Sequence, residues 1–285
     1  MNDPAQFRDP FRLDYQKYVR LQQRRTADFA EVVDNYGSAD YRDSLDPVYL
    51  ENQLIMTAGT FFGEYQSTFY TTRAASLQPI PALRECSMFQ SLDELRHAQM
   101  DLWRMRSWGA DWDYVDEVAR DVFPNTAALF RWLNSLDDPF KIVFCGNFIL
   151  ETPGEALFPD RAQRCEANGD HAGFLIENSR VKDEVRHIGF AKTMTKFLLD
   201  QDPGHNEKVL LAWQDEFFDL LSESFGELEE QEDAIPVQPI PKEDTVLRGF
   251  QAYMDHLDAI QLRPPELLSA LFGGEIDVPS VTAIA

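Results

Sequence analysis

Two of the five histidines in this chain stand in the same pentapeptide, Asp-Glu-x-Arg-His, which occupies residues 93–97 and again residues 183–187. On a helix, residues three apart lie on one face, so the glutamate and the histidine of each copy can bind one metal ion. The carboxylate supplies a hard oxygen ligand and the imidazole a nitrogen ligand. One such motif from each of two helices, with one glutamate from each of two others, is the ligand set of di-iron carboxylate sites in four-helix bundles.

Two further glutamates stand where such a site needs them, each in an otherwise apolar run. Glu64 precedes the first pentapeptide, and Glu151 the second, each by about one helical hairpin. An unpaired carboxylate in apolar surroundings is costly, and a shared pair of cations would compensate all four carboxylates at once. We therefore predict six metal ligands: Glu64, Glu94, His97, Glu151, Glu184 and His187.

The aspartate and the arginine of each pentapeptide fit a supporting role. A metal-bound imidazole usually donates its other N–H to a carboxylate, which fixes its tautomer and its ring direction. We expect Asp93 and Asp183 each to serve the histidine of the opposite repeat. Arg96 and Arg186 could then pair with those aspartates. For each of these residues alone, a surface ion pair is the alternative.

A proline interrupts the chain just after Glu151, in the run Glu-Thr-Pro-Gly-Glu. Proline inside a helix removes one hydrogen bond and kinks the helix. Glu155 lies four residues after Glu151, and so on the same helical face, which predicts it as an extra or alternative metal ligand, or as a partner of metal-bound water. The alternative is that the kink swings Glu155 toward solvent or onto an arginine.

The elements that position these residues are predicted to be helical almost throughout. Proline and glycine separate long periodic segments, and the sequence has no long alternation of polar and apolar residues and no Asn-Gly or Asp-Gly hairpin signal. The predicted fold is all-α, a ferritin-like four-helix bundle with additional helices. We expect long helices over 9–36, 46–76, 81–108, 171–200 and 204–225, a further long helix that begins at 138, and shorter ones over 110–136.

The domain organisation follows from the acidic, proline-rich run after the last long helix. We expect the di-iron bundle and its N-terminal helix over residues 1–226, and a connector with a C-terminal helical appendage over 227–285. The long segment over 7–36 has few partners within this bundle, so we expect it to take part in association with another chain.

Charge and cysteine content narrow the partners and the compartment. The chain has 26 Lys+Arg against 49 Asp+Glu, a formal net charge of −23. Such a surface repels phosphate backbones and anionic headgroups, so we expect no nucleic acid and no membrane as partner. The sequence shows no apolar run long enough for a membrane span and no apolar signal region at the N-terminus. Three unclustered cysteines further favour a cytoplasmic protein.

The stretch from Cys86 to His97 resembles the first metal motif of the catalytic subunits of bacterial multicomponent monooxygenases, the soluble methane, toluene, phenol and alkene hydroxylases. The second pentapeptide and the two lone glutamates fall where that family has its remaining ligands. Residues 7–19 and 188–225 are more similar to the family's smaller β subunit, as is the chain's length. The catalytic subunits carry a threonine four residues after the third glutamate ligand, where this chain has Glu155.

The resemblance implies an oxygenase in which two iron ions activate O₂ to hydroxylate or otherwise oxidise a small organic substrate. Electrons would come from a separate reductase, because the chain has no flavin or nucleotide fingerprint and its cysteines cannot hold an iron–sulfur centre. The resemblance further implies a small coupling protein. We expect a homodimer or an assembly with a related subunit.

Three other functions share parts of this pattern. A β-type scaffold subunit without activity typically loses its ligands, whereas all six are present here. A ribonucleotide reductase radical subunit typically has a tyrosine four residues after the first histidine ligand, where this chain has Asp101. Iron-storage bundles are much shorter and need no acidic, proline-rich tail.

Overall fold

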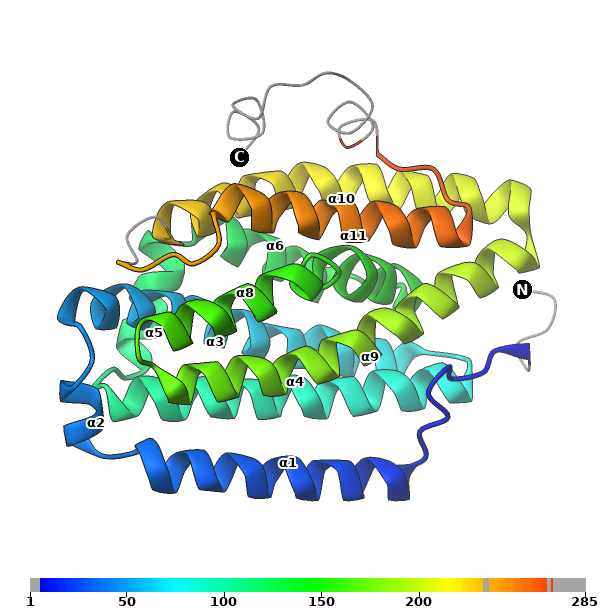
Figure 1. Cartoon of the computed structure of the whole chain (residues 1–285). Coiled ribbons are helices and arrows are strands. Elements are labelled where there is room, and N and C mark those ends of the chain that lie inside the picture. Colours follow the sequence, from blue (N-terminus) through cyan, green and yellow to red (C-terminus); the bar gives the residue numbers. More distant parts are fainter. Residues whose placement is uncertain (1–5, 233–235, 266–267, 269–285) are drawn as a thin grey trace.

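The computed structural model describes residues 6–232, 236–265 and 268, and these residues are helical without any strand (Figure 1). The prediction of an all-α chain is confirmed. The elements in chain order are α1 (Tyr15–Tyr36), α2 (Ala39–Asp43), α3 (Pro47–Leu77), α4 (Pro81–Ser107), α5 (Trp112–Asp121), α6 (Pro124–Ser135), α7 (Pro139–Ile142), the π-helix η2 (Val143–Leu150), α8 (Gly154–Ala167), α9 (His171–Gln201), α10 (Pro203–Glu232) and α11 (Lys242–Ile260).

Two of the long helices, α3 and α9, begin directly after a capping aspartate. The carboxylate of Asp46 accepts the backbone N–H groups of Val48 and Tyr49, and Pro47 takes the first helical position of α3. Asp170 caps α9 in the same way, through the backbone N–H of Gly173. These caps satisfy donors that the first turn of a helix leaves unpaired, and they fix where the two helices start.

The first helix starts later than predicted, at Tyr15 instead of near Asp9. The carboxylate of Asp9 accepts the backbone N–H groups of Phe11 and Leu13, and Arg12 has a φ of 50°. A residue in the left-handed region cannot continue a right-handed helix, so the segment before α1 forms a separate turn.

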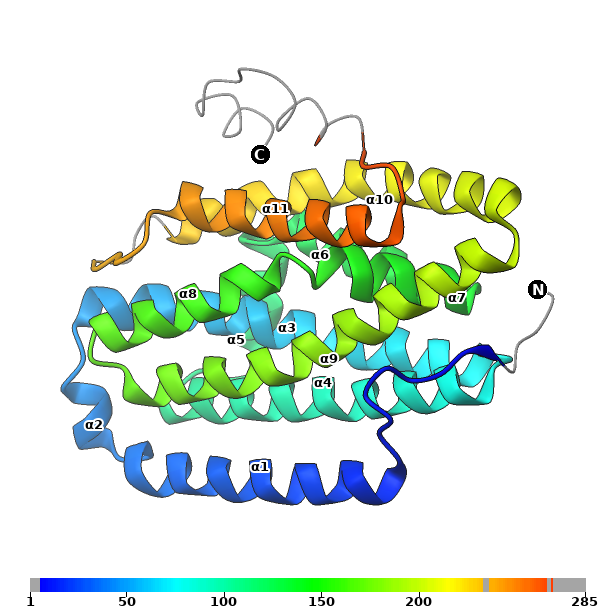
Figure 2. The ribbon, with the colours of Figure 1, turned by 45° about the vertical axis from the view of Figure 1, so that its right-hand side comes forward.

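Two pairs of long elements form the centre of the molecule. Helix α3 packs along α4, and η2 with α8 packs along α9, in both views of the ribbon (Figures 1 and 2). Helices α10 and α11 cover one side of this bundle, and α1 runs along the opposite side, beside α4 and α9. The fully buried aromatic side chains between the elements include Tyr70, Phe144, Phe148 and Phe190.

The fourth element of the bundle is broken where the sequence carries proline. Residues 143–150 form a π-helix, and a turn over 151–153 separates it from α8. Within this turn the N–H of Gly154 bonds to the carbonyl of Glu151 at 2.8 Å, and that of Glu155 to the carbonyl of Thr152 at 3.0 Å. These bonds span three residues instead of four, so the predicted kink is a longer interruption of the helix.

The end of the described chain packs onto the bundle. Helix α10 continues past residue 227, the expected start of the connector, to Glu232, and α11 lies against α8. The carboxylate of Asp160 on α8 pairs with Thr245 and Arg248 of α11. The division at residue 226 stays a prediction, and residues 233–235, 266–267 and 269–285 of the expected appendage lie outside the described residues.

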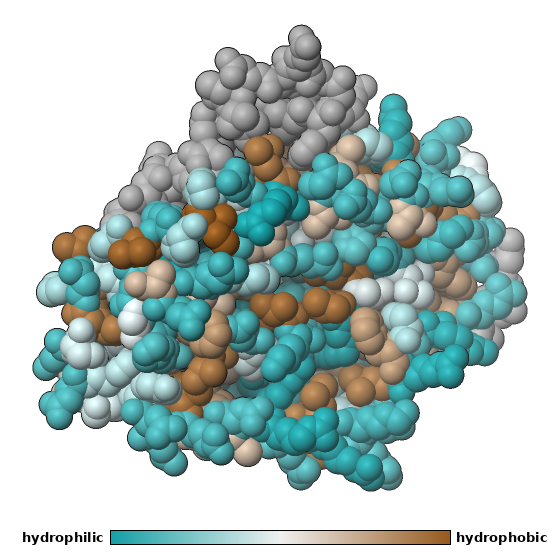
Figure 3. Space-filling model, viewed as in Figure 1, coloured by the Kyte–Doolittle hydropathy of each residue, from teal (hydrophilic) through white to brown (hydrophobic). Residues whose placement is uncertain are grey.

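The face of the molecule shown in Figure 3 is mostly hydrophilic, with apolar side chains in small groups. This surface agrees with the large negative net charge of the chain. Among the described helices, none combines the length and the apolar character that a membrane crossing requires.

Candidate metal centre

The six predicted ligands come together inside the bundle, in two adjoining groups. In each group the nearest ligand atoms of all members lie within 4.8 Å of one another. Their role as metal ligands stays a prediction, while the geometry that the prediction requires is present. The first group is Glu64, Glu94, His97 and Glu184, and the second is Glu94, Glu151 and His187.

Each histidine turns its Nδ1 atom toward the carboxylates. Nδ1 of His97 lies 3.3 Å from Glu64 Oε2 and 3.6 Å from Glu184 Oε1. Nδ1 of His187 lies 3.4 Å from Glu94 Oε1 and 3.5 Å from Glu151 Oε2. Both imidazoles are fully buried. Each group therefore presents one nitrogen and at least two oxygens to a common point.

The other nitrogen of each histidine meets the aspartate of the opposite repeat. Nε2 of His97 lies 3.3 Å from Asp183 Oδ2, and Nε2 of His187 lies 3.3 Å from Asp93 Oδ2. Both contacts predicted from the duplicated pentapeptide are present. When Nε2 carries the proton, it donates a hydrogen bond to the aspartate. Nδ1 then keeps a lone pair directed at the glutamates, as a metal ligand requires.

Arginines pair with both aspartates, as the sequence predicts. Arg96 pairs with Asp183, and Arg186 pairs with Asp93 and lies 2.8 Å from Asp183 Oδ1. Burial alone would raise the pKa of Asp93, but the charge of Arg186 and the hydrogen bond from the opposite histidine outweigh it and lower that pKa. Asp93 therefore stays ionised although it is fully buried.

Helix α1 contributes three side chains to these aspartates that the sequence analysis missed. The hydroxyl of Tyr18 donates to Asp93 Oδ1 at 3.2 Å, Gln22 donates to the same atom, and Arg25 pairs with Asp183. The only signal in the sequence is their spacing of four and three residues, one face of a helix. The expectation that α1 has few partners in the bundle was wrong, and association with another chain stays a prediction.

The pKa values of the glutamates show how crowded the negative charge is. Burial and the charge of Glu64 raise the pKa of Glu94 well above its ordinary value. Burial and the charge of Glu184 raise the pKa of Glu151 to about 8. Burial would also raise the pKa of Glu64, but the charge of Arg180 and the interactions with His97 together outweigh it and lower that pKa. Like charges held this close keep protons unless cations replace them.

The pKa values of the two histidines shift in opposite directions. Burial lowers the pKa of His97. Burial acts on His187 too, but the hydrogen bond between its Nε2 and Asp93 and the nearby carboxylates of Glu151 and Glu184 together outweigh it and raise the pKa of His187. A proton on this histidine compensates part of the carboxylate charge, and metal binding would displace it.

Two buried atoms of the second group test whether a metal fits. Within the described part of the chain, neither Oε2 of Glu151 nor Nδ1 of His187 has a hydrogen-bond partner, and the two lie 3.5 Å apart. Buried polar atoms without partners are rare and costly. A cation between a carboxylate oxygen and an imidazole nitrogen would satisfy both, so this donor set fits a divalent metal.

A cavity of about 150 Å³ adjoins the centre. The four glutamates of the two groups line it on one side, with Thr60 and Ser67 from the helix of Glu64. Thr126 and Ser224 line it farther along and hydrogen-bond to each other at 2.8 Å. The apolar part of its wall comes from Leu129, Phe130, Leu157, Phe158 and Leu221.

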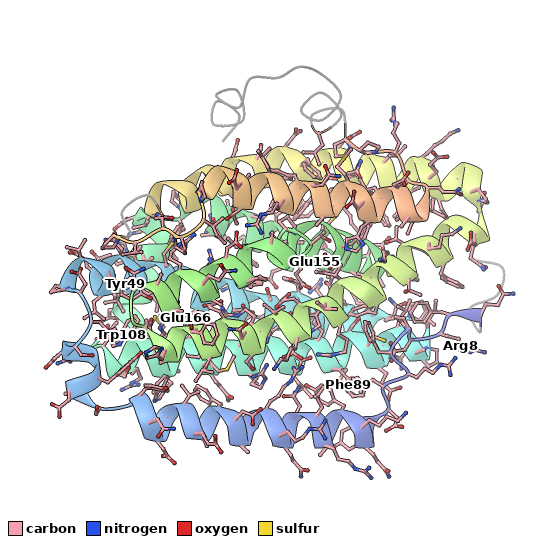
Figure 4. All side chains as sticks on the ribbon, viewed as in Figure 1. Arg8, Tyr49, Phe89, Trp108, Glu155 and Glu166 are labelled. Carbon is pink, nitrogen blue, oxygen red and sulfur yellow. The ribbon has the colours of Figure 1, made fainter. Side chains whose placement is uncertain are left out.

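The structure places Glu155 apart from both metal groups, at the start of α8 beside α11 (Figure 4). Its Oε1 lies 3.1 Å from Nε2 of His256, whose Nδ1 accepts from Lys192 at 2.9 Å. The expected place of Glu155 beside Glu151 was therefore wrong. The four-residue rule holds for a continuous helix, whereas the turn over 151–153 changes the direction of the chain between the two glutamates.

A comparison with known protein families can be set against this geometry. The sequence model of the methane/phenol/alkene hydroxylases matches residues 1–202. The chain belongs to this family. The resemblance carried by the metal motifs is thereby confirmed.

A relative within the family shows how much of a longer chain is present here. The oxygenase component DmpN of phenol 2-monooxygenase from Pseudomonas sp. strain CF600 is 24% identical over 226 residues. The match takes in 76% of this chain but 43% of the relative, so the chain spans less than half the length of that curated relative.

Three solved structures of known proteins share the fold. Phenol hydroxylase from Pseudomonas sp. OX1 gives a TM-score of 0.83 at 20% identity, over 93% of this chain and 56% of that one. Toluene 4-monooxygenase, solved with toluene in its resting active site, gives 0.70 at 16% identity, over 90% and 80%. A Synechococcus protein with aldehyde deformylating oxidase activity gives 0.59 at 17% identity, over 84% and 96%. The predicted ferritin-like bundle with additional helices is confirmed.

Proposed function

We propose that this chain is the hydroxylase component of a multicomponent monooxygenase. Two iron ions held by the six buried ligands would activate O₂ to oxidise a small organic substrate, with electrons from a separate reductase. The observation that carries the proposal is the convergence of both Glu-x-x-His motifs and both lone glutamates beside one cavity, with each histidine backed by an aspartate. A scaffold subunit has no need of this complete arrangement.

The residues of the chain have distinct tasks in this proposal. When bound, a pair of iron ions supplies the redox chemistry of O₂ activation. Glu94 belongs to both ligand groups, so it would help to hold the metal at each position. Asp93 and Asp183 hold the imidazoles in one tautomer. The bundle keeps the ligands out of water, where the carboxylates would be solvated and more mobile.

The cavity supports a small and largely apolar substrate. Its volume of about 150 Å³ equals that of an apolar protein cavity known to hold benzene. The aromatic and aliphatic part of the wall offers no partner for a charged group, so it favours an uncharged substrate; the charged side chains of the lining are the four glutamates and Arg161. A monocyclic aromatic compound or a short alkene fits these limits.

The partners and the compartment belong to the same proposal. A reductase is required because the described residues bring no cysteines together and the sequence carries no flavin motif. A small coupling protein and a dimer, or an assembly with a related subunit, are proposed from the resemblance. The three cysteines are buried and unpaired, which supports a reducing cytoplasm.

Iron loading tests the metal centre. After anaerobic addition of ferrous iron and desalting, we expect about two irons per chain, because six ligands suffice for two ions. Glu151→Ala should lose iron. Glu166→Ala, which removes an exposed glutamate from the far end of α8, should not.

A single-turnover experiment tests the activity. The iron-loaded protein is reduced chemically, mixed with ¹⁸O₂ and phenol, toluene or propene, and its products are analysed by mass spectrometry. We expect ¹⁸O in an oxidised product of at least one probe. Less than about one iron per chain, with no labelled product, would make the chain a scaffold subunit.

A further inference from the structure

Each lone glutamate is held on one oxygen by a side chain from the opposite repeat. Oε1 of Glu64 lies 2.9 Å from Nε of Arg180, and Oε1 of Glu151 accepts a 2.7 Å hydrogen bond from Nε2 of Gln90. Gln90 stands four residues before the glutamate of the first pentapeptide, and Arg180 four residues before that of the second. One helical turn therefore separates each holding residue from its motif, and the two occupy equivalent places in the repeat.

The oxygens that remain face the histidines. Oε2 of Glu64 lies 3.3 Å from Nδ1 of His97, and Oε2 of Glu151 lies 3.5 Å from Nδ1 of His187. Each lone glutamate thus has one occupied oxygen and one directed at its metal group. Both are set to bind a metal through a single oxygen.

The two holding residues differ in charge and in how firmly they are fixed. Arg180 is fully buried, its Nη1 donates to Glu177 at 2.8 Å, and its Nη2 donates to Asp101 at 2.7 Å. These two hydrogen bonds fix the guanidinium, so its charge stays beside Glu64 and restrains that carboxylate as an ion pair, although Nε itself makes no hydrogen bond within the described residues. Glu64 also lies on α3, which is a continuous α-helix.

Glu151 is held more loosely. Gln90 is neutral, and the nitrogen that donates to Glu151 also donates to Glu94 at 3.0 Å. Its carbonyl accepts from Asn147 of the π-helix, which fixes the direction of the amide. Glu151 itself lies in the turn between η2 and α8, without the support of regular helical hydrogen bonds on both sides. A carboxylate in this setting can change position when a metal arrives.

We propose that Arg180 and Gln90 are positioning residues that make the two metal positions unequal. The position beside His97 is preformed and fills first, and the position beside His187 fills second, when Glu151 moves. Four donors already lie together at the first position and three at the second. This inference rests on the proposed function, because it concerns the same metal centre.

Cobalt binding tests the order of filling without any assay of activity. Metal-free protein is titrated with Co²⁺ and followed by visible absorption, and crystals grown with one equivalent are examined by anomalous diffraction. We expect two binding steps whose Kd values differ about tenfold or more, and anomalous density beside His97 at one equivalent. Iron need not be present, so the result is independent of O₂ chemistry.

Variants separate the two holding residues. Removing Arg180 alone would leave three carboxylates without a cation, so Arg180→Gln is combined with Asp101→Asn and Glu177→Gln, which neutralise the two that belong to no metal group. This variant should weaken the first step about tenfold and leave the second within twofold, and Arg180→Lys should retain part of the first. Gln90→Leu should weaken the second step more than the first, because Gln90 holds Glu151 but also donates to Glu94, which belongs to both groups.

A buried ion pair remote from the metals provides the matched control. Arg104 and Asp170 pair at the far end of α4, and Arg104 stands about 10 Å along the helix from His97. Arg104→Gln with Asp170→Asn should leave both Kd values unchanged. A single binding step, cobalt beside His187 at one equivalent, or an equal loss in the Arg180 variant and in this control overturns the inference. Failure of the wild type to bind any Co²⁺ overturns the proposed function as well.

Discussion

The substitution Asp93→Asn tests whether the crossed aspartates determine how the metal ligands are oriented. Asp93 is fully buried, and its carboxylate accepts from four side chains. Asparagine keeps the volume but replaces one acceptor oxygen by a donor and removes the charge. The imidazole opposite then loses the acceptor that fixes its tautomer. The four donors are Tyr18, Gln22, Arg186 and His187.

Two effects of different size follow from this geometry. Loss of the partner that orients a ligating histidine typically costs 10–100-fold in metal affinity, which is about 1.4–2.7 kcal/mol. Breaking one partner of a buried charge pair costs about 3–5 kcal/mol of folding stability. Arg186 keeps Asp183 at 2.8 Å as a second counter-ion, so we expect the lower end, about 3 kcal/mol.

Two measurements distinguish these effects. Urea unfolding of the metal-free protein gives the change in stability, and Co²⁺ titration gives the change in affinity. Asp170→Asn is the matched control, because Asp170 is equally buried and paired with Arg104 but belongs to no metal group. Both variants should lose stability, and Asp93→Asn alone should lose affinity. An affinity within twofold of the wild type for Asp93→Asn would refute the orienting role.

Three further predictions concern a titrating carboxyl, the misplaced glutamate and the cavity. Burial raises the pKa of Asp101 from 3.8 to about 7, so between these values the folded protein holds a proton that the unfolded chain has lost, and stability falls as pH rises through this window. In urea unfolding between about pH 4 and 7, the free energy of unfolding of the wild type should therefore fall by up to about 1.4 kcal/mol per pH unit relative to that of Asp101→Asn. Parallel pH profiles of the two proteins would contradict the shift. Glu155→Thr should keep about two irons per chain, since Glu155 pairs with His256, and a loss of half the iron would restore it as a ligand. Leu157→Phe fills part of the cavity wall, so it should slow oxidation of toluene more than that of propene at unchanged iron content; equal slowing would place the substrate elsewhere.

The course of the main helices could be predicted from the sequence because their ends carry strong local signals. Asp46 with Pro47, and Asp170, cap helices through contacts within four residues. The start of α1 was misjudged because Asp9 also caps a turn, and only the left-handed φ of Arg12 shows that no helix follows. The length of α10 depends on packing against distant elements, which local patterns do not report.

The crossed contacts of the metal centre could be predicted because they follow from symmetry. Two copies of one motif on antiparallel helices must present the same side chains to each other, so the aspartate of one copy meets the histidine of the other. The same symmetry brings Gln90 and Arg180 to equivalent places, but the sequence does not indicate this equivalence, because the two side chains differ. The sequence therefore indicates the part of the centre that is duplicated and gives little sign of the part in which the two halves differ.

The prediction for Glu155 failed for a reason that also bears on function. Counting four residues from Glu151 assumes a regular helix, and the π-helix and turn around Glu151 remove that regularity. An irregular backbone has fewer hydrogen bonds to hold its side chains, which is the condition for a ligand that changes position on metal binding. The interruption that made Glu155 unpredictable is thus the feature that leaves Glu151 mobile. Glu64, on an unbroken helix and held by Arg180, has no such freedom. The inequality proposed for the two metal positions therefore has its origin in the backbone as well as in the charge of the residues that hold the two glutamates.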